Sequence, residues 1–326
     1  GRVVIHRVDG EMLKDNPLGD PVERDLYVYL PPGYDESRTY PALLALVGFT
    51  GTGGMLFNLD PFSESLDRRL DRLIGAGECP PVIVAFPDCF TRWGGSQYLN
   101  SSATGPYEDY LCDELVPFVD SELRTRPERG VFGKSSGGYG ALRLAMRRPG
   151  LFRAVASHSG DMGFALSLRG FEAALGRFAA AGSIEEWVEQ FESREGVADA
   201  DFDAIHTLAM ASCYSPDPDR PFGIALPMDL ETGERDPDVW RRWMENDPVE
   251  MVTEPAHAEA LRGLRLLLLD CGFRDEWNLH LGLRLFRARL DELGIAHETE
   301  EFDGTHRSIS YRYDVSIPKL ARALTE

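Results

Sequence analysis

Short apolar segments alternate with amphipathic segments along most of the chain. Residues 42–47 and 81–86 are almost entirely apolar, as strands of a parallel sheet are when helices cover both faces. Apolar and polar residues alternate at 25–30, and a Pro-Pro-Gly turn at 31–33 predicts that this earlier strand ends there. The whole pattern predicts an α/β fold with a mainly parallel central sheet flanked by helices.

A helix is predicted between the first two apolar segments. Asp60 and Pro61 offer an N-cap and a proline for the first helical turn. Apolar residues then recur at the spacing of one helix face, at Leu66, Leu70, Leu73 and Ile74. Near the C-terminus, 264–269 and 297–302 are typical of two strands, separated by a helix at 279–290.

The alternation is interrupted in the second half of the chain. Residues 162–252 are rich in Ala, Phe, Trp and acidic residues and contain irregular Pro and Gly segments. We predict a single domain over residues 1–326 that carries a mostly helical insertion at 162–252.

The charge of the chain argues against two kinds of partner. Asp and Glu outnumber Lys and Arg by 54 to 34 over 326 residues, a net charge of −20, so phosphate backbones and anionic membrane surfaces are repelled. No apolar run approaches the ~18 residues of a membrane-spanning helix. We therefore expect no nucleic acid and no membrane as partners.

The five cysteines show no spacing typical of a metal site. They include no C-x-x-C pair and no His/Cys cluster, so we expect neither a bound metal nor a disulfide framework. The N-terminal residues lack the basic and apolar segments of a signal peptide. This weakly favours the cytoplasm, although a chain whose signal peptide had been removed would begin in the same way.

The most informative stretch is a G-x-S-x-G motif at residues 133–137. It follows a short apolar segment at 131–132 and precedes a helical pattern, which is the strand–turn–helix setting of a nucleophile elbow. Ser135 would lie at the apex of the turn, where the helix dipole and the N–H of Ser136 both favour an oxyanion. The alternative is a Gly- and Ser-rich turn without chemistry.

Two carboxylates after the strand at 264–269 are candidates for the acid of a catalytic triad. Asp275 lies further into the loop, where its side chain can reach back toward a histidine, and we favour it. Asp270 directly follows the apolar run and is suited to hydrogen-bonding turn amides. Glu276 is expected in the first turn of the next helix.

Chain order selects the histidine, because the acid precedes the histidine in this kind of triad. Of the histidines after the acid, His280 falls on a predicted helix and His297 in a predicted strand. His306 follows the last strand, beside a glycine that permits a tight turn, and is the predicted general base. His158 follows the strand after the elbow and is expected to line a pocket or to be structural.

The oxyanion hole needs a second N–H group from the loop after the third strand. That loop, at 47–54, is rich in glycine, which lets the backbone approach closely. The N–H of Phe49 is the candidate. Phosphate binding is the alternative for a glycine-rich loop, but neither of its common motifs occurs here.

These motifs together resemble the putative-esterase branch of the α/β-hydrolases, which includes esterase D, S-formylglutathione hydrolase, the enterochelin esterases and the mycolyltransferases. The similar segments, which together extend over most of the chain, are 29–34, the loop at Gly48, 133–141, 246–249, 271–275 and His306. The resemblance implies an α/β-hydrolase fold. It assigns Ser135 as nucleophile, His306 as general base and acid, Asp275 as its orienter, and the N–H groups of Phe49 and Ser136 as the oxyanion hole.

The chain departs from the pattern of this branch at two positions. Val47 stands where the branch often has histidine, and Lys134 where histidine is more usual. The resemblance also implies that the loop at 91–98 lies at the rim of the site, where Trp93 and Tyr98 pack either against substrate or into the core. The insertion at 162–252 lies where lids occur in this fold, and a contact in a homodimer is the alternative.

The sequence therefore predicts a serine hydrolase that cleaves carboxylic esters through an acyl-enzyme on Ser135. Its partner would be a small-molecule ester, and no metal or organic cofactor is needed. Two alternatives remain open. The same triad serves an acyltransferase or an amidase, and a catalytically silent binding module would retain the fold alone.

Overall fold

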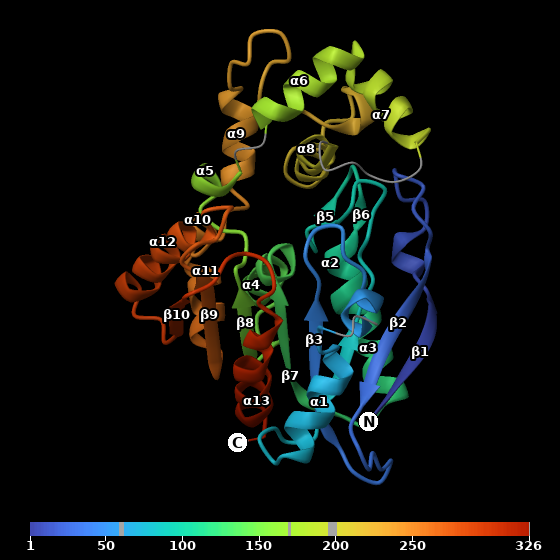
Figure 1. Cartoon of the computed structure of the whole chain (residues 1–326), viewed down its shortest axis with the longest axis vertical. Helices are drawn as coiled ribbons and strands as arrows, with labels where there is room; N and C mark the ends of the chain where they lie inside the picture. Colours follow the sequence, from blue (N-terminus) through green and yellow to red (C-terminus); the bar gives the residue numbers. More distant parts are fainter. Residues whose placement is uncertain (59–61, 169–170, 195–200, 326) are drawn as a thin grey trace.

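The computed structural model describes residues 1–58, 62–168, 171–194 and 201–325. In these residues an eight-stranded sheet has the order β1-β2-β4-β3-β7-β8-β9-β10 (Figure 1). β1 and β4 each pair antiparallel with β2, and the other neighbouring strands pair parallel. The strands are β1 (Arg2–Asp9), β2 (Glu23–Leu30), β3 (Tyr40–Leu46), β4 (Ile83–Phe86), β7 (Thr125–Lys134), β8 (Ala154–His158), β9 (Leu266–Gly272) and β10 (Glu298–Phe302).

Helices cover both faces of this sheet, as the apolar strands predicted. Along β3, Leu43 and Ala45 pack with one set of helices, whereas Leu44 and Leu46 pack with the other, because successive strand residues point to opposite faces. The first face carries α1 (Leu66–Gly75) and α13 (Tyr313–Ala323), and the second carries α3 (Val116–Glu122), α4 (Ser136–Arg147), α11 (Pro255–Arg262) and α12 (Leu279–Glu292). The predicted α/β class with a mainly parallel sheet is confirmed.

Shorter elements connect β4 to β7. They are the small hairpin β5 (Asn100–Ser101) and β6 (Gly105–Pro106), the short helix α2 (Tyr107–Asp109) and the π-helical turn η3 (Tyr110–Leu115) that leads into α3. Single 3-10 turns lie elsewhere, at η1 (Glu11–Leu13), η2 (Gly53–Phe57), η5 (Pro221–Gly223) and η6 (Ser310–Arg312). The elements between β4 and β7 bring the loop at 91–98 close to the start of α4.

Several predicted boundaries differ from the structure. α1 begins at Leu66 after Ser65, whose backbone is extended, and not directly after Pro61; Asp60 and Pro61 lie outside the described residues. β9 continues past residue 269 and therefore includes Asp270. His297 directly precedes β10 and does not lie within it.

β1 has no counterpart among the predicted strands. It lies at the edge of the sheet, paired on one side only with β2. Most of its side chains are exposed or half-buried, so its sequence lacks the apolar run that marks a buried strand.

The insertion at 162–252 is mostly helical in its described part. It contains α5 (Phe164–Ser167), α6 (Phe171–Ala181), α7 (Ile184–Glu192), α8 (Phe202–Tyr214), α9 (Pro237–Met244) and α10 (Pro248–Met251). Figure 1 shows α6, α7, α8 and α9 gathered beyond one end of the sheet. They pack around an apolar cluster distinct from those on the two sheet faces, and its fully buried Trp243 donates a hydrogen bond to Ser215 Oγ over 2.8 Å.

A buried carboxylate ties the two ends of the insertion together. Asp247 accepts hydrogen bonds from the N–H groups of Gly163 (2.9 Å) and Phe164 (2.6 Å) at the start of α5, and from Val249 (3.0 Å) in α10. Asp247 is therefore the N-cap of α10 and also anchors the chain where it leaves β8.

A second buried network holds α13 against the sheet. His158 Nδ1 is 2.7 Å from Asp270 Oδ1, and His158 Nε2 is 2.9 Å from Ser316 Oγ. Arg312 Nε donates to Asp270 Oδ2 over 2.8 Å, and Arg312 also binds Glu300. Because His158, Asp270 and Ser316 are all buried, we assign His158 the structural role left open by the sequence. Asp270 is also structural, but its carboxylate binds the side chains of His158 and Arg312 and not the turn amides that the sequence suggested.

We expect Asp270→Asn to lower the free energy of unfolding by about 3 kcal/mol, because it leaves the buried Arg312 guanidinium with one partner fewer. Urea unfolding measures this. The control is Asp303→Asn, whose ion pair with Arg274 is exposed on both sides and should change stability by less than about 0.5 kcal/mol. A loss at Asp270 no larger than at Asp303 would contradict the structural role of this network.

Candidate active site

Ser135 lies in a strained turn between β7 and α4. Its backbone angles are φ 58° and ψ −128°, in a region that side-chain-bearing residues rarely adopt. Such strain persists only where the surrounding structure imposes it, and it is frequent at functional sites. The observed strand–turn–helix geometry is that of the predicted nucleophile elbow.

The two glycines of the motif make this turn possible. A Cβ at Gly133 would overlap the backbone of Gly137, and a Cβ at Gly137 would overlap the carbonyl group of Leu46 at the end of β3. The loop after β3 is equally close, since a Cβ at Gly48 would lie 3.3 Å from the Cβ of Ser135. The elbow and the glycine-rich loop therefore meet at the serine.

Three residues from separate loops form a hydrogen-bonded series. His306 Nε2 lies 3.1 Å from Ser135 Oγ, and His306 Nδ1 lies 2.8 Å from Asp275 Oδ2. Ser135 follows β7, Asp275 follows β9, and His306 follows β10, so the ends of parallel strands bring them to one edge of the sheet. The structure thus brings together the three residues that the sequence selected.

The surroundings of Asp275 favour its ionised form. Burial opposes ionisation, but hydrogen bonds from His306 and from the N–H of Trp277 (2.9 Å) outweigh it and hold the pKa of Asp275 below its ordinary value. Glu276 lies nearby without reaching the imidazole; its Oε2 accepts the backbone N–H of His306 over 2.7 Å. Asp275 is therefore the carboxylate that contacts the His306 ring.

The two predicted oxyanion donors are available. No hydrogen bond within the described ranges uses the backbone N–H of Phe49 or of Ser136. The Phe49 loop is fixed from both sides, because Thr50 N–H donates to Gly94 O (2.8 Å) and Gly51 N–H donates to Gly48 O (2.9 Å). Ser136 is the first residue of α4, where the helix dipole adds positive potential.

A buried carboxyl group that the sequence analysis did not select lies beside these residues. Asp161 Oδ2 accepts a hydrogen bond from Ser136 Oγ over 3.0 Å, and Gln97 Nε2 donates to the same Ser136 oxygen over 3.0 Å. Burial raises the pKa of Asp161 to about 6, although His306 and the Ser136 hydrogen bond favour its charged form. The sequence signal that could have selected Asp161 is its position just beyond the carboxyl end of β8, because ligands bind at such strand ends in α/β sheets.

A cavity of about 200 Å³ opens beside Ser135 and His306. One part of its lining is aromatic, with Phe49, Phe202, His206 and Trp277 in mutual ring contact. Burial lowers the pKa of His206 to about 4, so this imidazole is neutral near pH 7. The charged lining residues are Lys134, Asp161 and Arg307.

The aromatic lining from the insertion was not predicted from the sequence. Phe202 and His206 lie one turn apart on α8, a helix whose apolar residues mostly face its own packing cluster. Such a pattern has the appearance of an ordinary core helix. In the sequence, the only indication that the insertion contributes to the site was its position along the chain.

Trp93 and Tyr98 do not line this cavity. Trp93 is fully buried and packs edge-to-face against Phe222. The Tyr98 hydroxyl donates to the carbonyl of Val47 over 2.6 Å, and its ring occupies the space beside Gly140. Of the two roles considered for these residues, the structure favours core anchors, and we do not assign them to substrate binding.

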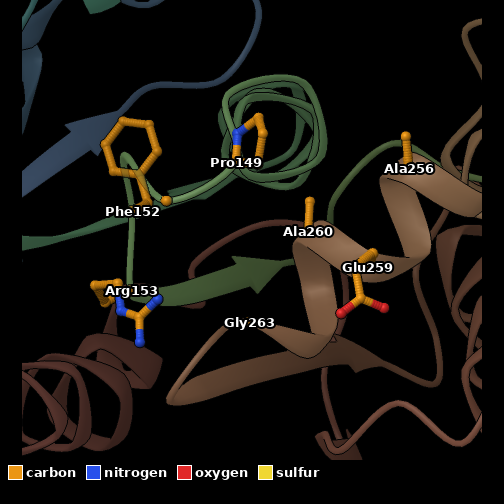
Figure 2. A pocket seen from close by; sticks show the side chains of 8 residues that line it. Pro149, Phe152, Arg153, Ala256, Glu259, Ala260 and Gly263 are labelled. Atoms are coloured by element: carbon orange, nitrogen blue, oxygen red, sulfur yellow. The ribbon is translucent and has the colours of Figure 1, made fainter.

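A larger hollow of about 320 Å³ lies far from this chemistry (Figure 2). It is lined by Phe152, Arg153 and Glu259, among others, and follows the C-terminal end of α4, whereas Ser135 precedes the N-terminal end. The 12 residues of α4 separate the two by about 18 Å. Its lining contains no histidine, cysteine or serine, so it is not a catalytic candidate.

Over the described ranges, no group of three or more His, Cys, Asp or Glu side chains has an arrangement that could hold a metal ion. Likewise, none of the helices in those ranges is both long and apolar enough to cross a membrane.

The sheet order, the elbow and the position of Ser135 define an α/β-hydrolase of the serine-hydrolase type. The chain belongs to the esterase family described as "Putative esterase", whose model matches residues 21–315. The fold is shared with solved structures at low sequence identity. A ferulic acid esterase has a TM-score of 0.62 at 19% identity over 99% of this chain and 98% of that one, and the S-formylglutathione hydrolase of Agrobacterium tumefaciens has 0.57 at 19% over 99% and 94%.

Curated relatives match over a shorter stretch. Esterase Rv1288 of Mycobacterium tuberculosis is 36% identical over 143 residues, which are 41% of this chain and 28% of that protein. The S-formylglutathione hydrolase of Mus musculus is 27% identical over 139 residues, 40% of this chain and 49% of that protein. The matched part is therefore less than half of either relative.

We expect Asp161→Asn to stabilise the protein at pH 8, because an acid whose pKa is raised by folding costs stability once it is ionised. The cost is full above pH 6, amounts to about 3 kcal/mol for a pKa raised from 3.8 to about 6, and vanishes as the pH falls toward 4. Urea unfolding of both proteins at pH 8 and pH 4.5 measures the difference. An advantage of Asn that does not shrink at the lower pH would contradict this assignment.

Proposed function

We propose that the protein is a serine hydrolase that cleaves small carboxylic esters. The observation that carries the proposal is the series Ser135–His306–Asp275, with both hydrogen bonds formed, at the edge of a cavity. The family assignment supports the same class of reaction. The chemistry needs no metal and no organic cofactor.

The reaction begins with proton transfer from Ser135 Oγ to His306 Nε2 as Oγ attacks the ester carbonyl. Asp275 holds the imidazole in the required tautomer and stabilises the imidazolium. The N–H groups of Phe49 and Ser136 are aimed at the oxyanion that forms, an effect that commonly contributes ~10²–10³ in rate.

The tetrahedral intermediate then collapses to an acyl-enzyme. His306 gives its proton to the leaving alcohol, and the acyl group stays on Ser135 Oγ. A water molecule next loses a proton to His306 and attacks the acyl carbonyl. Ser135 recovers its proton, and the carboxylic acid is released.

The insertion serves as a lid in this proposal. α8 contributes Phe202 and His206 to the cavity lining, so the insertion covers part of the site in a single chain. The aromatic lining favours a flat apolar or aryl group on the substrate. Relatives in the same family and fold include a ferulic acid esterase and S-formylglutathione hydrolases.

We expect Ser135→Ala to lower the turnover of p-nitrophenyl esters by at least about 10⁴-fold, because no acyl-enzyme can form. A pre-steady-state burst should be present in the wild type and absent in the variant, and urea unfolding should confirm that the variant is folded. Pre-steady-state kinetics with p-nitrophenyl esters of increasing acyl length measures the burst and the turnover rate of both proteins. Turnover by Ser135→Ala near the wild-type rate would contradict the proposal.

The alternative functions predict different outcomes. A rate that depends on an added alcohol or amine acceptor would indicate an acyltransferase, and cleavage of amides alone would indicate an amidase. Failure of Ser135 to react with a fluorophosphonate probe, together with no turnover, would indicate a silent binding module.

We expect Asp275→Asn to lower kcat by about 10⁴-fold, because the amide leaves the His306 ring in the wrong tautomer. Glu276→Gln is the matched control, since the amide oxygen still accepts the His306 backbone N–H. Its kcat should fall by less than about 10-fold. Equal losses in the two variants, measured by steady-state kinetics, would count against Asp275 as the orienting acid.

A further inference from the structure

Two cations flank the reacting pair along the chain and both line the cavity. Lys134 directly precedes Ser135, and Arg307 directly follows His306. Because each cation is the immediate chain neighbour of Ser135 or His306, the fold that brings these two residues together also places the backbone of both cations beside them. The mechanism proposed above uses neither side chain.

Lys134 is unusual within this chain. Of the three lysines, the exposed Lys14 and the half-buried Lys319 form ion pairs with Glu11 and Glu298. Lys134 is half-buried, and its ammonium group forms no hydrogen bond or ion pair with any described residue. Burial lowers its pKa, although Asp275 and Asp161 counteract this. An incompletely solvated, unpaired ammonium costs stability, and in the described part of the chain only the charges of nearby carboxylates, without a direct ion pair, offset that cost.

Arg307 also differs from several arginines around it. In the C-terminal segment, Arg274 pairs with Asp303 and Arg312 with Asp270. The Arg307 side chain is exposed and has no ion-pair or hydrogen-bond partner among the described residues. Its guanidinium is therefore free to bind an anion at the mouth of the cavity.

The carboxylates near Lys134 are each engaged by another group. Asp275 binds the His306 ring, Glu276 accepts the His306 N–H, and Asp161 accepts a hydrogen bond from Ser136. None of the three lies within 4.0 Å of the Lys134 ammonium as an ion pair. Asp161 lines the cavity and the other two lie near Lys134, and this negative charge favours a ligand with a single negative charge over one with two.

We propose that Lys134 and Arg307 form an anion-binding edge of the cavity and that the substrate is an ester bearing one carboxylate in addition to the ester group. This inference rests on the proposed esterase function. The apolar part of such a substrate would contact the aromatic lining, while the carboxylate binds the two cations by charge-assisted hydrogen bonds. The chain as a whole carries a net charge of −20, so the two cations attract an anion only at short range, within the cavity.

Matched ester pairs test the proposal, and they also distinguish which part of the substrate carries the carboxylate. For the acyl part, the pair is mono-4-nitrophenyl adipate and 4-nitrophenyl hexanoate. For the alcohol part, it is 4-acetoxybenzoate and 4-acetoxybenzamide. The measured quantity is the ratio of kcat/KM for the anionic ester to that for the neutral ester, in wild type, Lys134→Met, Arg307→Gln and the control Arg68→Gln.

In the wild type this ratio should exceed one for at least one pair. Lys134→Met should lower it by about tenfold and the more exposed Arg307→Gln by about threefold, mainly through KM. Arg68 is exposed on α1, away from the cavity lining, and its substitution should leave the ratio unchanged. A wild-type ratio at or below one for both pairs, or an unchanged ratio in Lys134→Met, would overturn the proposal.

A binding measurement separates this inference from the esterase proposal. If the wild type hydrolyses none of the four esters, the proposed function fails for this substrate class, and the anion site is decided by calorimetry. Ser135→Ala should bind 4-hydroxybenzoate more tightly than 4-hydroxybenzamide, and adding Lys134→Met should remove the difference. Equal binding of the two compounds to Ser135→Ala would overturn the anion site.

Discussion

The close approach of three backbone segments at Gly133, Gly137 and Leu46 is the constraint on which the site depends. The first turn of α4 can lie against the ends of β3 and β7 only because no Cβ intervenes. This contact imposes the left-handed conformation of Ser135 and also brings the loop at Gly48 against the serine. One packing constraint therefore positions both Ser135, the proposed nucleophile, and the backbone of the proposed oxyanion hole.

Two hydrogen-bonded Ser-His-Asp series occur among the residues that the structure describes, and their surroundings differ. Ser316, His158 and Asp270 are sealed between α13 and the sheet, where a satisfied polar network makes the packing specific. Ser135, His306 and Asp275 lie at the strand ends beside a cavity. The residue types alone do not distinguish the two series; access to a substrate does.

The sequence predicted the features that follow from short-range patterns. The buried strands, the elbow and the order of serine, acid and histidine all derive from residues that are close together or follow strand ends. Asp161 follows the strand end of β8 and could have been selected in the same way. Phe202 and His206 could not, because their positions in the site depend on how the insertion folds beyond the strand ends. Trp93 was named from the sequence but lies in the core, because a tryptophan in a loop gives no indication of whether it faces solvent, substrate or core.

The apolar cluster beneath the insertion and the strand ends of the sheet are under different demands. Ser135, His306 and the supporting glycines belong to the strand ends, and at Gly133 and Gly137 any side chain would overlap neighbouring backbone. Phe202 and His206 belong to α8, and their rings reach the cavity through contacts with Phe49 and Trp277. Substitutions on this one helix can therefore reshape the cavity without altering the glycines that permit the turn at Ser135.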